Sequence, residues 1–332
     1  MVAKKAVALI SGGLDSVLAA KVIMEQGFDV VGLYCTTAFS KSFGRERDTS
    51  AARVSKALGI DLRVMDMGQA YIDLVRNPSH GYGKNVNPCI DCKIFMLKKA
   101  RTVMDEVSAS FVVTGEVLGQ RPMSQRRDTL HIIERDSGMR GMIVRPLSAT
   151  LLPPTSAEQD GLVQREKLLG ISGRSRTIQL RLAERYGISG YSTPAGGCLL
   201  TDKNFSAKLR DLFDDKQAVT PNDIRLLTVG RHYRLDSGVK IVVGRDEQEN
   251  TVLLSLAPHG YHLFTPRDFP GPVALLSGEP SQDLKQTIGR LIITYSKHIP
   301  GRTYHIQHGN EVFNPGEPLP FDTPGLRRVG AD

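Results

Sequence analysis

A glycine-rich turn between an apolar run and a helical stretch is the feature that most constrains the fold of this 332-residue chain. Residues 4–10 (KKAVALI) form a short apolar run with β propensity, and Ser11-Gly12-Gly13-Leu14-Asp15-Ser16 follow it directly. Residues 15–26 then have amphipathic helical spacing and end at Gly27, a typical helix stop. The segment therefore predicts a strand, a tight loop and a helix in immediate succession.

The same alternation continues along the chain. Further strands are expected at residues 28–35, 61–67 and 110–115, and further helices at residues 45–58 and 91–107. Strands that alternate with helices predict an α/β domain with a doubly wound parallel sheet, covered by helices on both faces. We expect this domain to span residues 1–200.

The pattern of residues changes after Gly196, which indicates a second domain. Short β-rich runs, such as residues 239–244 (VKIVVG) and 250–256 (NTVLLSL), are separated there by Gly, Pro and Asp. They predict a smaller α+β domain over residues 201–300. Residues 301–332 are rich in Pro and Gly with little apolar periodicity, so we expect an irregular tail on the surface.

Composition narrows the class of protein. No apolar run approaches the ~18 residues of a membrane span, and the run after Lys4 and Lys5 is too short for a signal peptide, which favours a cytoplasmic chain without membrane contact. Four cysteines are too few for a secreted disulfide framework in a chain of this length, so reduced thiols are expected. A net charge of +8 favours a polyanionic partner such as nucleic acid.

The glycine turn suits a phosphate group. Glycines at the carboxyl end of a strand let backbone amides approach an anion, and the following helix directs its positive end to the same place. Neither G-x-x-x-x-G-K-[ST] nor G-x-G-x-x-G follows this strand, so a Walker NTPase and a dinucleotide site are not supported. Ser11, Ser16 and the loop amides could cradle a pyrophosphate, with Asp15 helping to hold Mg²⁺. The alternative is an ordinary turn capped by Ser11 or Asp15.

These residues resemble known families. S-G-G-L-D-S resembles the loop of the PP-loop ATP pyrophosphatases, which cleave ATP between the α and β phosphates and adenylate a carbonyl oxygen. Residues 114–120 (TGEVLGQ), 124–125 (SQ) and 145–147 (RPL) are similar to the tRNA 4-thiouridine synthases, and residues 87–93 (NPCIDCK) to the tRNA 2-thiouridylases. The resemblance implies an adenine nucleotide alpha hydrolase-like fold and an ATP site formed by Ser11, Gly12, Gly13, Leu14, Asp15, Ser16 and Gly115.

The second domain resembles a different family. Residues 238–250, 259–264, 271–278 and 293–298 are similar to the NFACT-R domain, which implies RNA binding. They do not resemble the β-barrel of the 2-thiouridylases. The uridine and the ring position that would be modified therefore stay open.

The cysteines have several interpretations. Cys89 and Cys92 open a helix, and Cys198 is distant in sequence; this spacing alone leaves a structural zinc site, a redox pair and inert thiols open. The resemblance to thiolation enzymes implies catalytic roles for Cys92 and Cys198. It further implies either a persulfide on Cys198, which follows Pro194-Ala195-Gly196-Gly197, or a [4Fe-4S] cluster held by Cys89, Cys92 and Cys198. The sulfur donor would be a cysteine desulfurase or free sulfide.

Two basic stretches complete the hypothesis. Arginines are frequent in residues 121–135 and 165–185, with few acidic residues between them, as expected of a surface that binds tRNA phosphates. The residues expected to do so are Arg126, Arg127, Arg174, Arg176 and Arg181. The sequence thus predicts an ATP-dependent tRNA sulfurtransferase that adenylates a uridine carbonyl and replaces its oxygen with sulfur. Alternatives are a PP-loop ligase or sulfurtransferase for a small molecule, and a non-catalytic RNA-binding quality-control protein; a homodimer is left open.

Overall fold

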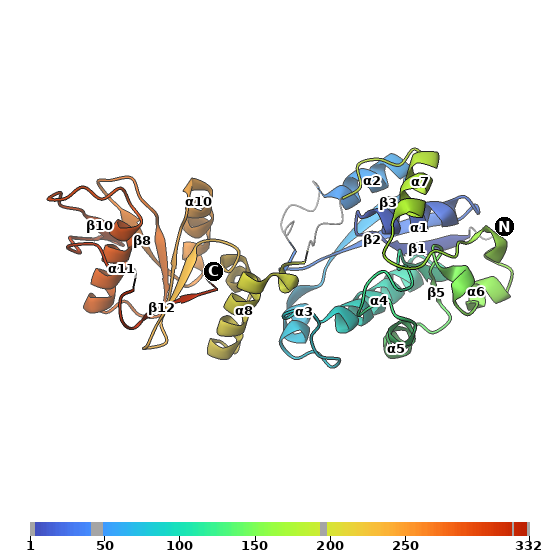
Figure 1. The fold of residues 1–332 in the computed structure, drawn as a ribbon, viewed down its shortest axis with the longest axis horizontal. Coiled ribbons are helices and arrows are strands. Elements are labelled where there is room, and N and C mark those ends of the chain that lie inside the picture. The colour runs from blue at the N-terminus through green and yellow to red at the C-terminus, as the bar shows by residue number, and fades with distance from the viewer. Residues whose placement is uncertain (1–3, 41–48, 193–197, 321, 331–332) are drawn as a thin grey trace. The chain divides into compact units, whose positions relative to one another are not determined.

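The computed structural model describes residues 4–40, 49–192, 198–320 and 322–330 (Figure 1). The chain divides into two compact units, Met1–Leu199 and Leu200–Asp332. Residues 194–197, expected to give substrate access beside Cys198, lie outside the described residues. None of the helices in the described ranges combines the length and apolar character needed to cross a membrane.

The first unit is built on a five-stranded parallel sheet with the order β3-β2-β1-β4-β5. Its strands are β1 (Lys5–Leu9), β2 (Asp29–Thr36), β3 (Asp61–Asp66), β4 (Phe111–Val113) and β5 (Ile143–Val144). Strand order reverses at β1, which pairs with β2 on one side and with β4 on the other. In sheets of this type ligands bind outside the carboxyl ends of the strands at such a reversal, which is where residues 11–16 lie.

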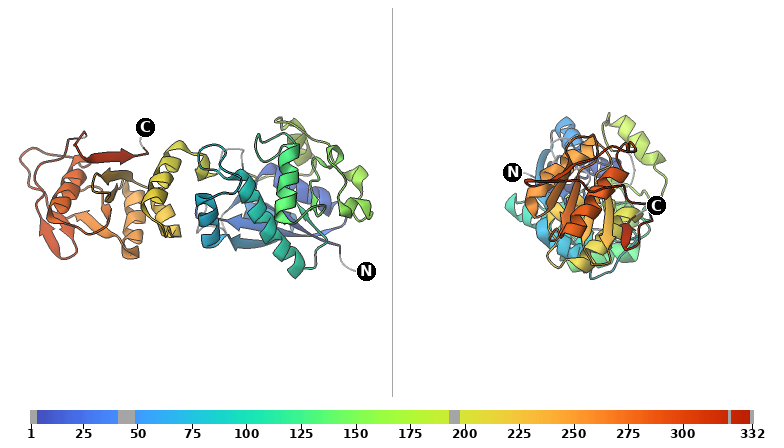
Figure 2. Two further views of the ribbon diagram at one scale, coloured as in Figure 1. Left: turned by 90° about the horizontal axis from the view of Figure 1, so that it is seen from below. Right: turned by 90° about the vertical axis from the view of Figure 1, so that its left-hand side faces the viewer.

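Helices cover both faces of this sheet. They are α1 (Leu14–Met24), α2 (Ser50–Leu58), α3 (Gly68–Arg76), α4 (Cys89–Glu106), α5 (Arg127–Ser137), α6 (Ser156–Gln159) and α7 (Thr177–Arg185). Figure 1 shows α1, α2 and α7 on one side of the strands and α4 and α5 on the other, and the view from below in Figure 2 shows α4 and α5 in front of the strands. The expected doubly wound α/β fold is confirmed.

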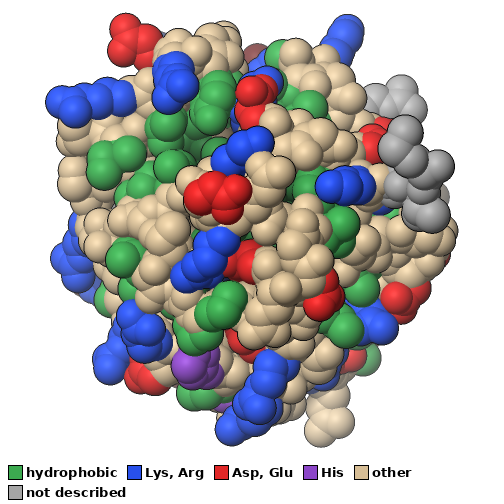
Figure 3. All heavy atoms as spheres, turned by 90° about the vertical axis from the view of Figure 1, so that its right-hand side faces the viewer, with side chains coloured by type: hydrophobic (Ala, Val, Ile, Leu, Met, Phe, Trp, Pro, Cys, Tyr) green, Lys and Arg blue, Asp and Glu red, His purple; other side chains and the backbone are tan. Residues whose placement is uncertain are grey.

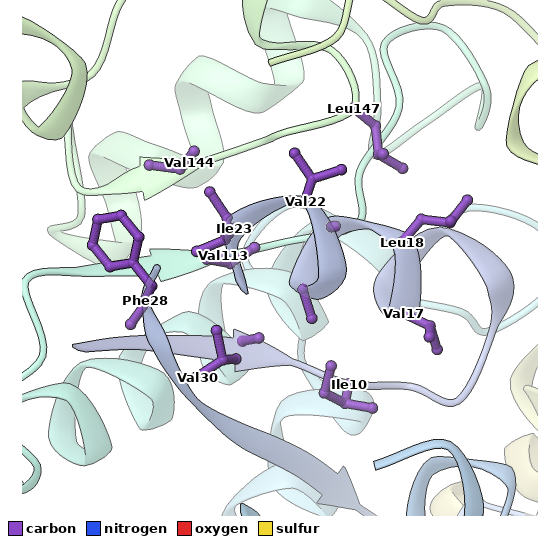
Figure 4. Close-up of a cluster of buried hydrophobic side chains, with 14 of the residues drawn as sticks. Ile10, Val17, Leu18, Val22, Ile23, Phe28, Val30, Val113, Val144 and Leu147 are labelled. Atoms are coloured by element: carbon purple, nitrogen blue, oxygen red, sulfur yellow. The ribbon is translucent and has the colours of Figure 1, made fainter. Parts of the chain in front are cut away.

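The core of the first unit has two layers. Between α1 and the sheet, buried side chains of the helix, among them Val17, Leu18 and Ile23, pack against those of the strands, such as Val30 and Val113 (Figure 4). A second cluster on the opposite face joins α4 to β1 and β4. Because both faces of the central strands are apolar, β1 reads as a continuous hydrophobic run.

The second unit contains a seven-stranded sheet with the order β11-β10-β8-β9-β7-β6-β12, in which the paired strands of the described residues are antiparallel. Its strands are β6 (Arg231–Leu235), β7 (Lys240–Val243), β8 (His262–Pro266), β9 (Ala274–Ser277), β10 (Ile306–His308), β11 (Glu311–Phe313) and β12 (Leu326–Val329). Its helices are α8 (Lys203–Asp215), α9 (Pro221–Leu226), α10 (Glu247–Leu256) and α11 (Gln282–Thr294). The second unit is therefore α+β, as expected.

Short 3-10 helices connect some of these elements. They are η2 (Ala149–Leu151), η3 (Arg165–Lys167), η4 (Leu199–Thr201) and η5 (Ala257–His259). Alternation along β7 places Ile241 and Val243 in the cluster that contains α11, and Val242 in the cluster that contains α10. Each face of the central strands is thus buried under a helix.

Two predictions for the second unit are wrong. Residues 250–256 were expected to contribute a strand but belong to α10, because the side chain of Asp246 caps the helix at Glu249 N (2.9 Å) and Leu253 and Leu256 share one buried face. Residues 301–332 were expected to be irregular, yet they supply β10, β11 and β12. Ile306 is fully buried in the core, and Gly309, with a φ of 57°, makes the tight turn between β10 and β11.

Candidate ATP-binding and thiol site

The loop after β1 has the geometry that close approach to an anion requires. Gly12 has a φ of 78°, and a Cβ there would lie 2.4 Å from the backbone nitrogen of Ala51. Gly13 caps α1 without a side-chain hydrogen bond, so amides of the first turn are available to a ligand. The Ser16 hydroxyl donates to Gly13 O (2.8 Å) and accepts from Ser11 N (3.2 Å), which fixes the loop.

A second glycine brings the end of β4 against this loop. A Cβ on Gly115 would lie 2.4 Å from the backbone nitrogen of Ser16, so only glycine fits. The Thr114–Gly115–Glu116 segment thereby lies against the start of α1. Gly115 shapes the site through this contact, and its part in ATP binding stays a prediction.

A cavity of about 360 Å³ opens over the loop. The loop contributes Ser11, Gly13, Leu14, Asp15 and Ser16, and β2 contributes Leu33, Tyr34 and Cys35; the other lining residues are Leu9, Ile10, Lys93, Met96, Thr114, Gly115, Glu116, Arg121, Gln125, Arg176 and Ser192. The lining combines a phosphate-type loop with apolar side chains at the ends of β1 and β2. Such a lining suits a ligand with an anionic end and a flat apolar end.

Asp15 has one carboxylate oxygen committed and one free. Its Oδ2 accepts from Gln120 Nε2 (2.7 Å) and from Arg176 Nη2 (3.4 Å), whereas its Oδ1 is buried without a hydrogen-bond partner. Gln120 is held in turn by Gln179 of α7, whose Nε2 donates to Gln120 Oε1 (3.1 Å). A buried carboxylate oxygen without a partner beside a phosphate-type loop fits an Mg²⁺ ligand.

Glu116 anchors the opposite wall through a buried chain of charges. Its Oε2 accepts from Arg145 Nε (2.9 Å), Arg145 also pairs with Glu134, and Lys93 Nζ lies 3.8 Å from Glu116 Oε1. Lys93 and Arg145 hold the pKa of Glu116 below its usual value against the opposing effect of burial. Glu116 is therefore ionised at neutral pH and fixes Lys93 at the cavity.

The cysteines gather around the hydroxyl of Tyr71. Tyr71 is 3% exposed, its Oη donates to Cys92 Sγ (3.0 Å), and burial together with the thiols of Cys92, Cys198 and Cys89 raises its pKa. Its ring makes edge contacts with Phe39 and Phe95, and Ser40, next to Phe39, forms a β-bridge with Cys198. The structure thus brings together the three cysteines that the sequence singled out.

These thiols flank the cavity over the loop. Lys93 and Met96 both line that cavity; Lys93 follows Cys92 in sequence, and Met96 Sδ lies 3.8 Å from Cys92 Sγ. Burial raises the pKa of Cys92 and of Cys89, and raises the pKa of Cys35 to about 12. At neutral pH these three side chains are therefore thiols rather than thiolates.

The [4Fe-4S] cluster on Cys89, Cys92 and Cys198 stays a prediction, because Cys198 adjoins residues 193–197, which lie outside the described residues. Within the ranges that the structure describes, no group of three or more His, Cys, Asp or Glu side chains is placed to hold a metal ion. Cys92 is instead engaged with Tyr71 and Met96.

The expected RNA-binding arginines fall into two groups. Arg126, Arg174 and Arg181 are exposed, and Arg127 is exposed while donating to the carbonyl of Leu151 (2.9 Å). Arg176 lines the cavity and lies 3.4 Å from Asp15, and its contact with tRNA stays a prediction. Figure 3 draws one face of the molecule, on which Lys and Arg side chains are spread among acidic and apolar ones.

Sequence reasoning missed several residues of the site. Glu116 and Gln120 lie within the T-G-E-V-L-G-Q motif that carried the resemblance, so that motif could have pointed to them. Tyr71 and Gln179 have no such signal. Their roles depend on contacts between segments far apart in sequence.

The fold, the loop and the cavity together define the class of the first unit as an α/β domain of the pyrophosphate-binding kind. Residues 1–150 match the family model of the thiamine biosynthesis protein ThiI, and residues 230–315 match the NFACT protein RNA binding domain. Both resemblances drawn from the motifs are thereby confirmed.

Individual relatives point the same way. The chain is 31% identical over 123 residues to a tRNA-specific 2-thiouridylase MnmA of Sulfurimonas denitrificans. This aligned segment covers 35% of each chain. It is 21% identical over 285 residues to the MnmA of Listeria monocytogenes serotype 4b, covering 77% of this chain and 72% of the relative. The chain thus spans about a third of the length of the first of these relatives. Among solved structures, the U34-tRNA thiolase NcsA from Methanococcus maripaludis with its [4Fe-4S] cluster is 16% identical, with a TM-score of 0.34, over 68% of this chain and 70% of the other.

Proposed function

We propose that this protein is an ATP-dependent tRNA sulfurtransferase that converts a uridine to a thiouridine. The observation that carries the proposal is that a phosphate-type cavity and a cluster of three cysteines adjoin each other in one unit, through Lys93 and Met96. The matches to the ThiI family and to 2-thiouridylases support the same activity.

The nucleotide end activates the base. ATP phosphates bind the amides of residues 12–16 and the hydroxyls of Ser11 and Ser16, with Asp15 Oδ1 available to Mg²⁺, which would neutralise charge on the phosphates. Arg176, already beside Asp15, contacts the anionic groups that develop as pyrophosphate leaves. Attack of the uridine carbonyl oxygen on the α-phosphate breaks the α–β phosphate bond and turns that oxygen into part of a good leaving group.

The thiol end replaces the oxygen. The terminal sulfur of a persulfide on Cys198 attacks the activated carbon, and AMP departs with the former carbonyl oxygen. Cys92 Sγ then attacks Cys198 Sγ and passes its thiol proton to the departing thiouridine, which leaves a Cys92–Cys198 disulfide. The persulfide is renewed in one of two ways. An external thiol reduces the disulfide and a cysteine desulfurase transfers the outer sulfur of its own persulfide to Cys198, or free sulfide attacks Cys198 Sγ in the disulfide, which forms the persulfide and releases Cys92 as a thiol.

The [4Fe-4S] hypothesis is not used in this mechanism. No step is assigned to a cluster, because the persulfide route needs only the thiols that lie near Tyr71. Iron and sulfide analysis of protein purified without oxygen tests this choice directly.

The proposed function is tested by mass spectrometry of tRNA nucleosides from cells with and without this protein. We expect one thiouridine to disappear when the protein is absent and to return with the wild-type chain but not with Cys198→Ala. A parallel assay measures tRNA-stimulated conversion of ATP to AMP. Unchanged nucleosides together with tRNA-independent turnover would favour a small-molecule substrate instead.

A further inference from the structure

Charge is divided unequally between the two units. Residues 1–199 contain 27 Lys and Arg against 19 Asp and Glu, whereas residues 200–332 contain 16 of each. The whole excess of +8 thus belongs to the first unit. Attraction to phosphate depends on such an excess. A unit without net charge has little overall attraction for phosphates, so contacts with bases can supply a larger share of its affinity for RNA.

The second unit has a hollow with suitable chemistry. A cavity of about 420 Å³ opens over β8 and β10, lined by Tyr261, His262, Leu263, Thr265, Gln307 and His308 together with Gly309. No Lys, Arg, Asp or Glu is among these lining residues. A lining of neutral hydrogen-bonding groups and rings does not select phosphate, but it suits a neutral planar molecule with polar edges.

The rings at this hollow are held in place. The imidazole of His308 stacks on the ring of Phe264 with centroids 4.4 Å apart and planes 11° apart, and Phe264 is fully buried. His308 Nε2 also lies 3.4 Å from His262 Nδ1. A ring fixed in this way loses little conformational entropy when a ligand binds.

The imidazole of His308 and the amide of Gln307 are also held in place by their neighbours. Burial and the nearby charges of His262 and Lys285 lower the pKa of His308, against the opposing charge of Glu311, so its ring offers one donor and one acceptor at neutral pH. Gln307 Nε2 donates to Gly309 O (3.1 Å), and Gln307 Oε1 accepts from Arg267 Nη1 (3.4 Å). These contacts orient the amide beside the imidazole.

We propose that this hollow over β8 and β10 binds an unpaired nucleobase of RNA, through the ring of His308 and the amide of Gln307. The inference rests on the proposed function, because it makes the second unit the part that holds the tRNA substrate by a base, while the first unit holds phosphates. Contacts between a base and an aromatic ring depend little on salt, unlike phosphate contacts. The two units should therefore contribute to binding in separable ways.

The test measures binding of an unmodified tRNA transcript to the full chain over a series of salt concentrations. We expect His308→Ala and Gln307→Ala each to weaken binding by about tenfold, with an unchanged slope of log affinity against log salt. His308→Phe should retain most of the affinity because it keeps a stacking ring. His259→Ala, outside the hollow in the same unit, is the matched control and should bind like wild type.

Other results would overturn the inference. Full affinity in folded His308→Ala and Gln307→Ala, or a lowered salt slope in either, would mean that no base is held here. Circular dichroism shows whether each variant is folded. If His308→Ala is unfolded, the binding of His308→Phe and Gln307→Ala tests the inference. A single-stranded RNA of twelve nucleotides serves as a second probe: if it binds through His308 while tRNA is never thiolated, the nucleobase site stands and the proposed function fails.

Discussion

Glu116→Gln removes one charge from the buried chain that links Lys93, Glu116, Arg145 and Glu134. Glu116 and Arg145 are 2% and 4% exposed, so the remaining charges cannot be compensated by water. Removing one partner of a buried pair costs about 3–5 kcal/mol. We expect about 3 kcal/mol, the lower end, because Arg145 keeps Glu134 and the amide still accepts a hydrogen bond. This corresponds to a lowering of the melting temperature by roughly 6–12 °C for a unit of this size.

The assay is urea denaturation of the full chain, following the transition of the first unit, at pH 7 and at lower pH. The matched control is Glu106→Gln, which makes the same chemical change in an exposed pair with Arg63, where about 0–1 kcal/mol is expected. Because the pKa of Glu116 is lowered in the folded state, its contribution is complete above the unfolded carboxylate pKa of about 4.3 and is lost as the pH falls through the lower folded value. The reasoning would be refuted if Glu116→Gln lowered the free energy of unfolding no more than Glu106→Gln does. It would also be refuted if the difference in that free energy between Glu116→Gln and wild type did not become smaller below pH ~4.

Three further predictions concern the site. Asp15→Ala should lower ATP-to-AMP conversion by about a hundredfold or more without unfolding the chain, because it removes the ligand proposed for Mg²⁺; normal turnover in a folded variant would contradict that role. Arg176→Ala should raise the KM for ATP by about ten- to a hundredfold through loss of a charge-assisted contact, whereas Arg181→Ala, on the exposed side of α7, should leave it unchanged. Protein purified without oxygen should thiolate tRNA without bound iron; loss of activity on removal of iron, together with loss of iron in Cys89→Ala, would restore the cluster hypothesis.

Features of the fold that depend on neighbouring residues could be predicted from the sequence. The S-G-G-L-D-S turn and the alternation of strands and helices predicted the first unit, because β1, β2 and β4 are apolar runs that local sequence shows directly. Residues 250–256 were misread as a strand because Val252, Leu253 and Leu254 are apolar in succession, whereas the cap at Asp246 starts a helix.

Contacts between segments far apart in the chain could not be predicted from the sequence. Arg176 lies in an arginine-rich stretch that indicated RNA binding, but the packing of α7 against α1 brings its side chain to Asp15, 161 residues earlier. The neighbourhood of Tyr71 and the three thiols likewise depends on loops that meet only in the folded chain. The Gly309-Asn310 turn was a local signal that could have been recognised as a hairpin.

The amide relay from Gln179 through Gln120 to Asp15 has a consequence for synthesis on the ribosome. The loop and its first helix emerge early and Gln120 follows, but Gln179, which holds the Gln120 amide, arrives with α7. Ser192, which donates its backbone N–H to Gly12 O (2.8 Å), arrives later still. Residues 1–150, the part that matches the ThiI family, therefore contain the loop without these supports. A nascent chain cannot complete its nucleotide site until almost the whole first unit has left the exit tunnel, which delays ATP binding until the thiols are also in place.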